Sequence, residues 1–428
     1  MKRSDIQKIH FIGIGGIGMS GLARLYLHEG ATVTGSDAHE SALTSKLEAE
    51  GIAVSYSQVP KNITDDIDLV VFTEAMSKDH PELVTAREKS IRTINYFEAL
   101  SEVANEYYLI AVSGTHGKST TTAMLIDILE EASFDPSAIV GSIRSKTGSN
   151  FRAGKSKYMV VEACEYKRDF LYLNPDILVI TNIEHEHVDY YKDLEDVQNA
   201  FHELAEKVPK EGAVIVASAS PSIVPVVKGI TARIIDYRIE VPKARLLHQP
   251  GLHNRMNAAA ARATALFLGI DAEIITVALE NFSGIARRFE YKGDVNGAKV
   301  YDDYAHHPTE IAASIAAARE VGQDKKLTVI FQPHTYTRTS ELFDDFVHAL
   351  RKADRVLVVP IYAAREDNIA GVSSEKIVSS LQALGVAAEH LHTLDAAALS
   401  IKESVDLDDL VVVMGAGDVT KVASILTD

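Results

Sequence analysis

The stretch Leu109–Thr122, LIAVSGTHGKSTTT, has the residue types of a phosphate-binding loop. An apolar strand runs into a glycine turn, and a helix is expected from about Ser119 to Glu131. Glycines let the backbone approach an anion, lysine supplies a positive charge, and the Ser119 hydroxyl can bind magnesium. The longer general pattern has a glycine where this chain has Val112, so this is a short variant. Its candidate nucleotide-binding residues are Gly114, Thr115, His116, Gly117, Lys118, Ser119 and Thr120.

A second group of polar residues follows two strands predicted at 157–163 and 176–183. Its members are Glu162, Glu165, His185, Glu186, His187 and Asp189. Parallel strands end at one edge of a sheet, so we expect this group near the phosphate loop. Glu162 and His187 are candidate magnesium ligands together with Ser119, because magnesium prefers hard oxygen ligands. A solvated loop after a strand is the alternative interpretation of the Glu-His run.

A glycine-rich turn of a different type lies near the N-terminus. In GIGGIG, the glycines at 13, 15 and 18 have G-x-G-x-x-G spacing between a strand and a helix expected from about Met19 to Glu29. Asp37 follows the next strand at about the distance of a ribose-binding acid. The pattern is typical of dinucleotide sites, although other nucleotide diphosphates use the same turn. A nicotinamide-dependent oxidoreductase is therefore one functional alternative.

Two asparagines begin an alanine-rich helix further along the chain. Asn254 and Asn257 are three residues apart, which puts both amides on one helical face. They have the chemistry to bind an adenine edge, and the alternative is that one of them caps the helix N-terminus. The stretch 283–297, SGIARRFEYKGDVNG, carries two arginines beside glycines and is interpreted as a domain boundary and hinge.

The third segment of the chain repeats the alternation of strands and helices. Asp302, Asp303, His306 and His307 end one predicted strand, and His334 and Arg338 end another. Ligands gather at the carboxyl ends of parallel strands, so these residues are expected to face a common crevice. The alternative for His306 and His307 is a pair of turn and N-cap histidines.

Length and composition predict a large protein with several α/β domains. The chain has 428 residues, a formal net charge of −17 and one cysteine. Its charge disfavours nucleic-acid and membrane-surface binding, and the single cysteine suits a reducing compartment, so we expect a cytoplasmic protein without a membrane span. The expected domains are a Rossmann-like domain at 1–104, a central P-loop ATPase domain with a mostly parallel sheet at 105–285, and a second Rossmann-like domain at 286–428.

Seven motifs in order across the chain resemble those of the Mur ligases. They are HFIGIGGIGMSGLA, SGTHGKSTTT, VEACEYKRDFL with TNIEHEHVDYY, GLHNRMNAAAA, ARRFEYKG, DDYAHHPTE and FQPHTYTRT. The resemblance implies three domains that bind a UDP-sugar, ATP and an amino acid. It also implies ATP-dependent amide formation with Mg²⁺, on the small-molecule substrates UDP-N-acetylmuramate and L-alanine, by a monomer or homodimer. A recycling ligase that adds a tripeptide to the same sugar is an alternative, and a second phosphate cradle argues against the oxidoreductase.

The resemblance also implies roles for individual residues. Lys118 would contact the ATP phosphates, Ser119 and Glu162 would hold magnesium, and His187 would help place a second metal ion. Asn254 and Asn257 would lie at the adenine, Arg288 would reach the phosphates, Asp303 would lie near the nucleotide, and His307 and Arg338 would bind the amino acid. The residues implied for the UDP-sugar are Gly15, Gly16, Gly18, Met19, Ser20 and Asp37.

Two positions depart from the family pattern. Cys164 stands where an aspartate is usual, and the TEAM stretch at 73–76 replaces a more usual serine pair. Neither position is among the residues assigned to the phosphates. We therefore expect activity to be retained. Because Cys164 removes one acidic group beside the proposed metal site, we expect the affinity for the metal to differ.

Overall fold

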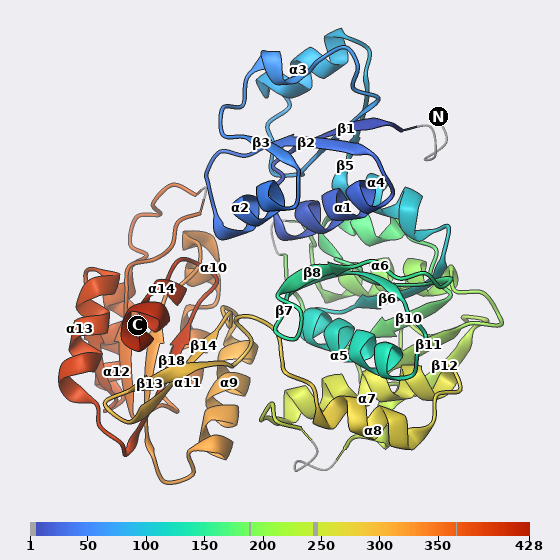
Figure 1. The fold of residues 1–428 in the computed structure, drawn as a ribbon. Coiled ribbons are helices and arrows are strands. Elements are labelled where there is room, and N and C mark those ends of the chain that lie inside the picture. The colour runs from blue at the N-terminus through green and yellow to red at the C-terminus, as the bar shows by residue number, and fades with distance from the viewer. Residues whose placement is uncertain (1–5, 188–189, 243–246, 365) are drawn as a thin grey trace. The chain divides into compact units, whose positions relative to one another are not determined.

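The computed structural model describes residues 6–187, 190–242, 247–364 and 366–428. It contains three β-sheets with flanking helices (Figure 1). The chain divides into two compact units. The first unit comprises Met1–Pro242 with Met256–Ser283, and the second comprises Lys243–Arg255 with Gly284–Asp428. The first unit contains two of the sheets, and the second unit contains the third.

The N-terminal sheet has five parallel strands in the order β3-β2-β1-β4-β5. Its strands are β1 Lys8–Ile12, β2 Thr32–Ser36, β3 Ala53–Ser55, β4 Leu69–Phe72 and β5 Arg92–Asn95. The helices between and after them are α1 Ile17–His28, α2 Ala42–Ala49, α3 Pro81–Glu88 and α4 Tyr96–Ala104, with a 3₁₀ turn, η2, at Pro60–Asn62. A capping box between Asn95 and Glu98 starts α4 directly after β5.

The central sheet has seven strands in the order β12-β11-β10-β6-β9-β7-β8, of which only the β7–β8 pair is antiparallel among the strands described. Its strands are β6 Tyr108–Ser113, β7 Ser137–Arg144, β8 Ser149–Arg152, β9 Tyr158–Glu162, β10 Ile177–Ile180, β11 Ala213–Val216 and β12 Arg233–Asp236. The helices are α5 Lys118–Glu131, α6 Leu194–Glu206, α7 Leu252–Phe267 and α8 Ala272–Glu280, with 3₁₀ segments η3 Tyr166–Tyr172 and η4 Tyr237–Glu240. Parallel pairing brings the carboxyl ends of β6, β9 and β10 to one edge.

The third sheet has six strands in the order β13-β14-β18-β15-β16-β17. Its strands are β13 Glu290–Val295, β14 Ala298–Asp303, β15 Lys326–Phe331, β16 Arg355–Val358, β17 Ala387–His390 and β18 Asp409–Met414. Its helices are α9 Pro308–Val321, α10 Tyr336–Glu341, α11 Phe343–Leu350, α12 Ser374–Ala383, α13 Leu394–Ser404 and α14 Thr420–Thr427. One apolar core joins the sheet to α9, α11 and α12, and another joins it to α13 and α14, so both faces are covered. This burial explains why β18 is an almost continuous apolar run, DLVVVM.

The three α/β sheets confirm the predicted fold class, with two local differences. The segment interpreted as a boundary and hinge contains β13, which forms an antiparallel hairpin with β14. Asn296 and Gly297 turn this hairpin with φ of 51° and 87°, the positive values that an Asn-Gly hairpin turn uses. The division between the two units, at Ser283 and Gly284, lies in this segment as expected. The strand at 290–295 was not predicted, because a polar edge strand has too little apolar patterning to stand out. The β7–β8 hairpin was also absent from the predicted elements.

Across the described ranges, none of the helices combines the length and the apolar composition that crossing a membrane requires.

Candidate active site

The phosphate loop lies between the end of β6 and the start of α5. Gly117 precedes the helix with φ of 85°, and Gly114 has φ of 123°, values that favour glycine. A side chain at Gly114 would collide with Thr181, because its Cβ would lie 2.2 Å from the Thr181 Oγ1. Asn182 fixes the loop, since its backbone oxygen accepts from the Thr115 N–H and its side-chain Oδ1 accepts from the His116 N–H. The loop is therefore a hydrogen-bonded, largely buried turn that leads directly into the N-terminus of α5.

Lys118 directly follows this loop, and its ammonium group forms an ion pair with Glu165. Its Nζ lies 3.0 Å and 3.2 Å from the two side-chain oxygens of Glu165, and it also donates to the carbonyls of Gly114 and Thr115. Burial alone would lower the pKa of Lys118, but the charge of Glu165 raises it above its ordinary value. The pKa of Glu165 is lowered by Lys118 and His187 in spite of burial. Both groups are therefore charged at neutral pH.

Ser119 and Glu162 form a pair of oxygen ligands beside Lys118. The Ser119 hydroxyl donates to Glu162 Oε2 over 2.9 Å, and the backbone N–H of Gly141 donates to the other carboxylate oxygen. Ser119 lies in the first turn of α5, and Glu162 ends β9, the strand beside β6. A hydroxyl and a carboxylate in contact are the hard donors that magnesium prefers. The pair predicted from the sequence is thus brought together in the first unit.

His187 lies against Glu165. Its Nε2 is 3.4 Å from Glu165 Oε1, and its ring packs on Tyr166. Glu165, Glu186 and His187 each offer an atom within 4.8 Å of the others, so they form a second group able to hold a cation. Asp189, named with this group in the sequence, lies outside the described residues. The sequence placed Glu165 in the polar group expected near the phosphate loop, but its contact with Lys118 was not predicted.

Cys164 lies between Glu162 and Glu165 in the sequence. It is the only cysteine, and its thiol is half-buried. Burial, reinforced by the charge of Glu165, raises the pKa of this thiol to about 12. The side chain at this position is therefore neutral at physiological pH.

The two asparagines lie inside α7, which begins at Leu252. Asn254 donates through its side-chain amide to the carbonyl of Pro250 over 2.8 Å. Asn257 lies beside the phosphate loop, because a Cβ built on Gly117 would be 2.3 Å from its Oδ1. Neither residue is the N-cap, so the capping alternative is wrong, and Asn257 is the asparagine that contacts the loop.

The N-terminal glycine turn joins β1 to α1. The Gly15 N–H donates to Asp37 Oδ2 over 2.8 Å, so Asp37 holds the turn itself. Gly13 packs against Thr73 and Met76 of the TEAM stretch, and Gly18 packs against the Tyr96 ring. Gly16 is the residue before the first turn of α1. Met19 and Ser20 are buried on α1, and Ser20 donates its hydroxyl to the Ile17 carbonyl.

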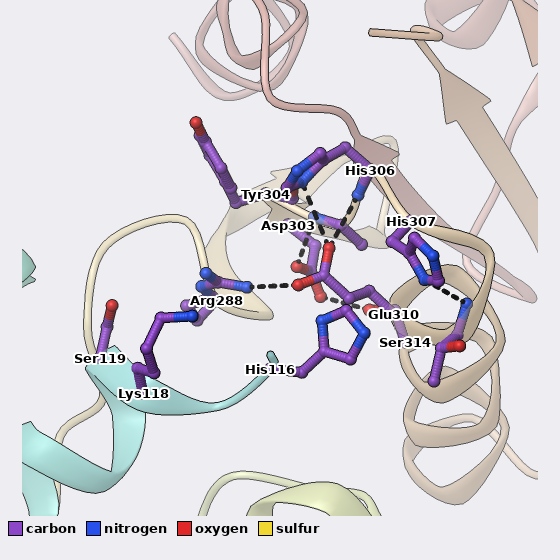
Figure 2. A network of polar contacts seen from close by, with 12 residues as sticks. His116, Lys118, Ser119, Arg288, Asp303, Tyr304, His306, His307, Glu310 and Ser314 are labelled. Carbon is purple, nitrogen blue, oxygen red and sulfur yellow. Dashed lines mark hydrogen bonds and ion pairs between the residues drawn. The ribbon is translucent and has the colours of Figure 1, made fainter. Parts of the chain in front are cut away.

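The polar residues of the second unit gather where β14 and β15 end. Figure 2 shows Arg288 and His306 directed at the carboxylate of Glu310. The ion-pair distances are 3.4 Å from Arg288 Nη1 and 3.2 Å from His306 Nδ1. The ring of His306 lies 5.8 Å from that of His334, whose Nδ1 is 3.2 Å from an Arg338 nitrogen. The predicted meeting of the two strand ends is confirmed.

His307 and Asp303 have defined structural partners. His307 is the N-cap of α9, where its Nδ1 accepts from the Thr309 N–H, as the N-cap alternative expected. Asp303 accepts from the Ser314 hydroxyl over 2.5 Å and from the Ala305 N–H over 3.0 Å (Figure 2). Burial raises the pKa of Asp303 to about 6, although the Ser314 hydrogen bond opposes this shift.

Replacing Asp303 by asparagine is expected to stabilise the protein above pH 6. The asparagine can accept from the Ala305 N–H and donate to the Ser314 oxygen. The folded-state pKa of Asp303 is raised from 3.8 to about 6, so the carboxylate destabilises the folded wild type increasingly as pH rises through this window. The advantage of Asp303→Asn should be absent at pH 4 and reach on the order of 2 kcal/mol above pH 6 in urea unfolding.

Asp354→Asn is the matched control for this measurement. The hydrogen bond from Arg319 lowers the pKa of Asp354, so this variant should lose stability relative to wild type once the pH rises above about 4. Opposite pH trends for the two variants are expected. A constant difference between Asp303→Asn and wild type from pH 4 to pH 8 would contradict the assignment.

Comparison with known protein families gives matches along the whole chain. Residues 8–108 match the model of the Mur ligase family, catalytic domain. Residues 112–255 match the Mur ligase middle domain, and residues 287–417 match the Mur ligase, glutamate ligase domain.

Individual relatives match over nearly their full length. The UDP-N-acetylmuramate–L-alanine ligase of Agathobacter rectalis is 42% identical over 453 aligned residues, which cover 99% of this chain and 98% of that protein. The crystal structure of UDP-N-acetylmuramate–alanine ligase from Thermotoga maritima matches with a TM-score of 0.82 and 29% identity, covering 97% of each chain. A murein peptide ligase from Psychrobacter arcticus matches with a TM-score of 0.71 and 26% identity over 98% of each chain.

Proposed function

Because this chain belongs to the Mur ligase family, we propose that it joins L-alanine to the lactyl carboxylate of UDP-N-acetylmuramate at the expense of ATP. The observation that carries the proposal is the N-terminus of α5, where Lys118 and Ser119 follow the phosphate loop and the Ser119 hydroxyl donates to Glu162. The full-length similarity to L-alanine ligases supports the choice of sugar and amino acid. The proposed reaction would take place in the cytoplasm, where ATP is available.

The chemistry follows from the low reactivity of a carboxylate. A carboxylate oxygen of the sugar attacks the γ-phosphorus of ATP, ADP leaves, and an acyl phosphate forms. The amino group of alanine then attacks the acyl carbon, and the tetrahedral intermediate expels phosphate and yields the amide. Charge develops on the transferring phosphoryl oxygens, and Lys118 and Arg288 are assigned to stabilise it. A base must also take a proton from the alanine ammonium group before attack.

The cation sites are assigned from the donor chemistry of the loop region. Ser119 and Glu162 would hold a magnesium ion, which supplies positive charge at the phosphates. His187, with Glu165 and Glu186, would hold a second cation. Asn257 would lie at the nucleotide, and Asn254 would support it from the first turn of α7.

The remaining assignments concern the other two substrates. The turn of Gly15, Gly16 and Gly18, fixed by Asp37, would hold the UDP diphosphate at the N-terminus of α1. Asp303 would lie near the nucleotide, and His307 and Arg338 would bind the carboxylate of the incoming alanine. The second unit resumes at Gly284, the point at which we expect hinge motion to exclude water from the acyl phosphate.

One assay tests the proposed function. The purified protein is supplied with ATP, magnesium and UDP-N-acetylmuramate, and ADP release is measured with L-alanine, glycine, L-serine or a stem tripeptide. L-Alanine should give the highest kcat/KM, and the loss of its methyl group in glycine should cost roughly tenfold or more. A preference for the tripeptide would instead indicate the recycling activity. The similarity to the murein peptide ligase of Psychrobacter arcticus is the reason to include this substrate. No amine-dependent ADP release would overturn the ligase assignment.

Gly117→Ala is expected to raise the KM for ATP at least tenfold. The φ of 85° at Gly117 disfavours any side chain, and the new Cβ would collide with Asn257. The change therefore both strains the loop and displaces the residue assigned to the nucleotide. Calorimetric titration with ATP and magnesium gives the corresponding dissociation constant.

Gly30→Ala is the matched control, because Gly30 has φ of 96° but no atom within 4 Å of the added Cβ. It introduces backbone strain of about 1–2 kcal/mol without a collision. Its KM for ATP should equal that of wild type. Equal ATP binding by Gly117→Ala and wild type would refute the nucleotide assignment of this loop.

A further inference from the structure

The β7–β8 hairpin, residues 137–152, belongs to the central sheet but reaches two different sites of the first unit. β7 pairs with β9 from Ser137 to Ile139 and then continues beyond the end of that pairing. At Gly141 its backbone N–H donates to the carboxylate of Glu162. A Cβ at Gly141 would lie 2.7 Å from that carboxylate, so the hairpin backbone is in close contact with the proposed magnesium ligand.

The other strand of the hairpin contacts the first turn of α1. Asn150, on β8, is fully buried, and its side-chain amide donates to the Ile17 carbonyl over 2.5 Å and to the Ser20 hydroxyl over 3.0 Å. Its Oδ1 accepts from Arg24 Nη1, one turn further along α1. The amide nitrogen and the carbonyl oxygen of this one side chain thus all bond to α1 of the N-terminal domain.

The backbone of α1 packs closely against the hairpin beside Asn150. Gly21 of α1 faces the hairpin, and a Cβ there would lie 2.9 Å from Ile139 and 3.2 Å from the Asn150 amide nitrogen. The backbone of α1 at Gly21 therefore packs directly on the hairpin, and the Asn150 side chain supplies the hydrogen bonds of this contact. Buried hydrogen bonds of this kind are directional and costly to break, so they fix a position more sharply than apolar packing does.

We propose that Asn150 is a positioning residue that holds the UDP-sugar-binding end of α1 from the ATP-binding domain. Ile17 and Ser20 lie in the turn that follows Gly16, and the N–H groups at this helix end are the ones assigned to the UDP diphosphate. The hairpin therefore sets where the sugar nucleotide lies relative to Glu162. The inference rests on the proposed function, and it extends the UDP-sugar site to a residue more than a hundred positions away in the sequence.

The test compares Asn150→Asp with wild type in the L-alanine-dependent assay. Aspartate has the same shape and still accepts from Arg24, but it cannot donate to the Ile17 carbonyl. We expect the KM for UDP-N-acetylmuramate to rise about tenfold, while the KM for ATP and the kcat at saturating sugar nucleotide change less than twofold. Gly21→Ala, which pushes α1 from the hairpin without removing a hydrogen bond, should shift the same KM in the same direction.

Lys46→Met is the matched control. Lys46 donates to the Gly148 carbonyl at the tip of the same hairpin, so the variant removes a hairpin contact to α2 and leaves α1 untouched. It should keep the wild-type KM for UDP-N-acetylmuramate. If Asn150→Asp fails to fold, Asn150→Ser, which retains a donor, is measured in its place and should show a smaller rise in the same KM.

The outcomes separate this inference from the proposed function. Wild type without amine-dependent ADP release would overturn the ligase assignment itself. An active wild type whose Asn150 variants have an unchanged KM for the sugar nucleotide would overturn only the positioning role. A parallel rise in the KM values for both ATP and the sugar nucleotide would also overturn it, because a general loosening of the fold does not select one substrate.

Discussion

Replacing Lys118 by alanine is expected to lower kcat by about a hundredfold to a thousandfold, since one preorganised charge at a transition state contributes about 3–4 kcal/mol. The ammonium group lies at the N-terminus of α5, where it adds to the helix dipole on the assigned phosphate site. Single-turnover measurement of acyl phosphate formation would locate the loss in the first chemical step. A variant with more than a tenth of the wild-type rate would show that the loop has another role.

The same substitution should also destabilise the protein, and a second variant separates the two effects. Glu165 is buried with Lys118 as its cation, so Lys118→Ala leaves an uncompensated charge that costs roughly 3–5 kcal/mol. Combining Lys118→Ala with Glu165→Gln removes that charge. The double variant should recover most of the lost thermal stability and none of the lost activity, which urea unfolding and the ADP assay would measure side by side.

Glu162→Gln is expected to lower the rate about a hundredfold at millimolar magnesium and to shift the magnesium titration to higher concentration. The amide keeps the size of the carboxylate but has no charge to offer a cation, and only one of its two polar atoms can accept. Removal of magnesium with a chelator should stop the wild-type reaction completely. Measurement of initial rates against magnesium concentration checks both statements.

Glu130→Gln serves as the control for Glu162→Gln. Glu130 is paired with Arg144, Lys146 and Arg152, which hold the pKa of its carboxyl at about 2 in spite of burial. Its loss should reduce stability without changing the magnesium dependence. If Glu162→Gln shows the magnesium dependence of wild type, then Glu162 is a structural carboxylate and the metal assignment fails.

Local patterns in the sequence predicted the parts of the site that are local in the chain. The loop from Gly114 to Ser119 is recognisable because its glycines, lysine and hydroxyl are consecutive and follow an apolar strand. Parallel topology then allowed the meeting of Ser119 with Glu162, and of the ends of β14 and β15, to be inferred from strand ends alone. These are consequences of backbone geometry that hold for many different side chains.

The residues that sequence reasoning missed depend on side-chain packing between distant segments. Glu165 was grouped with the polar residues expected near the phosphate loop, but its pairing with Lys118 was not predicted, because the turn that presents it contains Lys167 and Arg168 at positive φ. Asn150 had no motif, and its role depends on how two domains pack. The β13–β14 hairpin is a different case, because Asn296-Gly297 between two short strands was a readable turn signal.

The thiol of Cys164 has a consequence for the chemical durability of the enzyme. Alkylating agents, peroxides and disulfides react with the thiolate, and a pKa of about 12 leaves almost none of it at neutral pH. The chain has no other cysteine to form an intramolecular disulfide. The thiol beside the phosphate loop is therefore expected to react slowly with these agents at neutral pH.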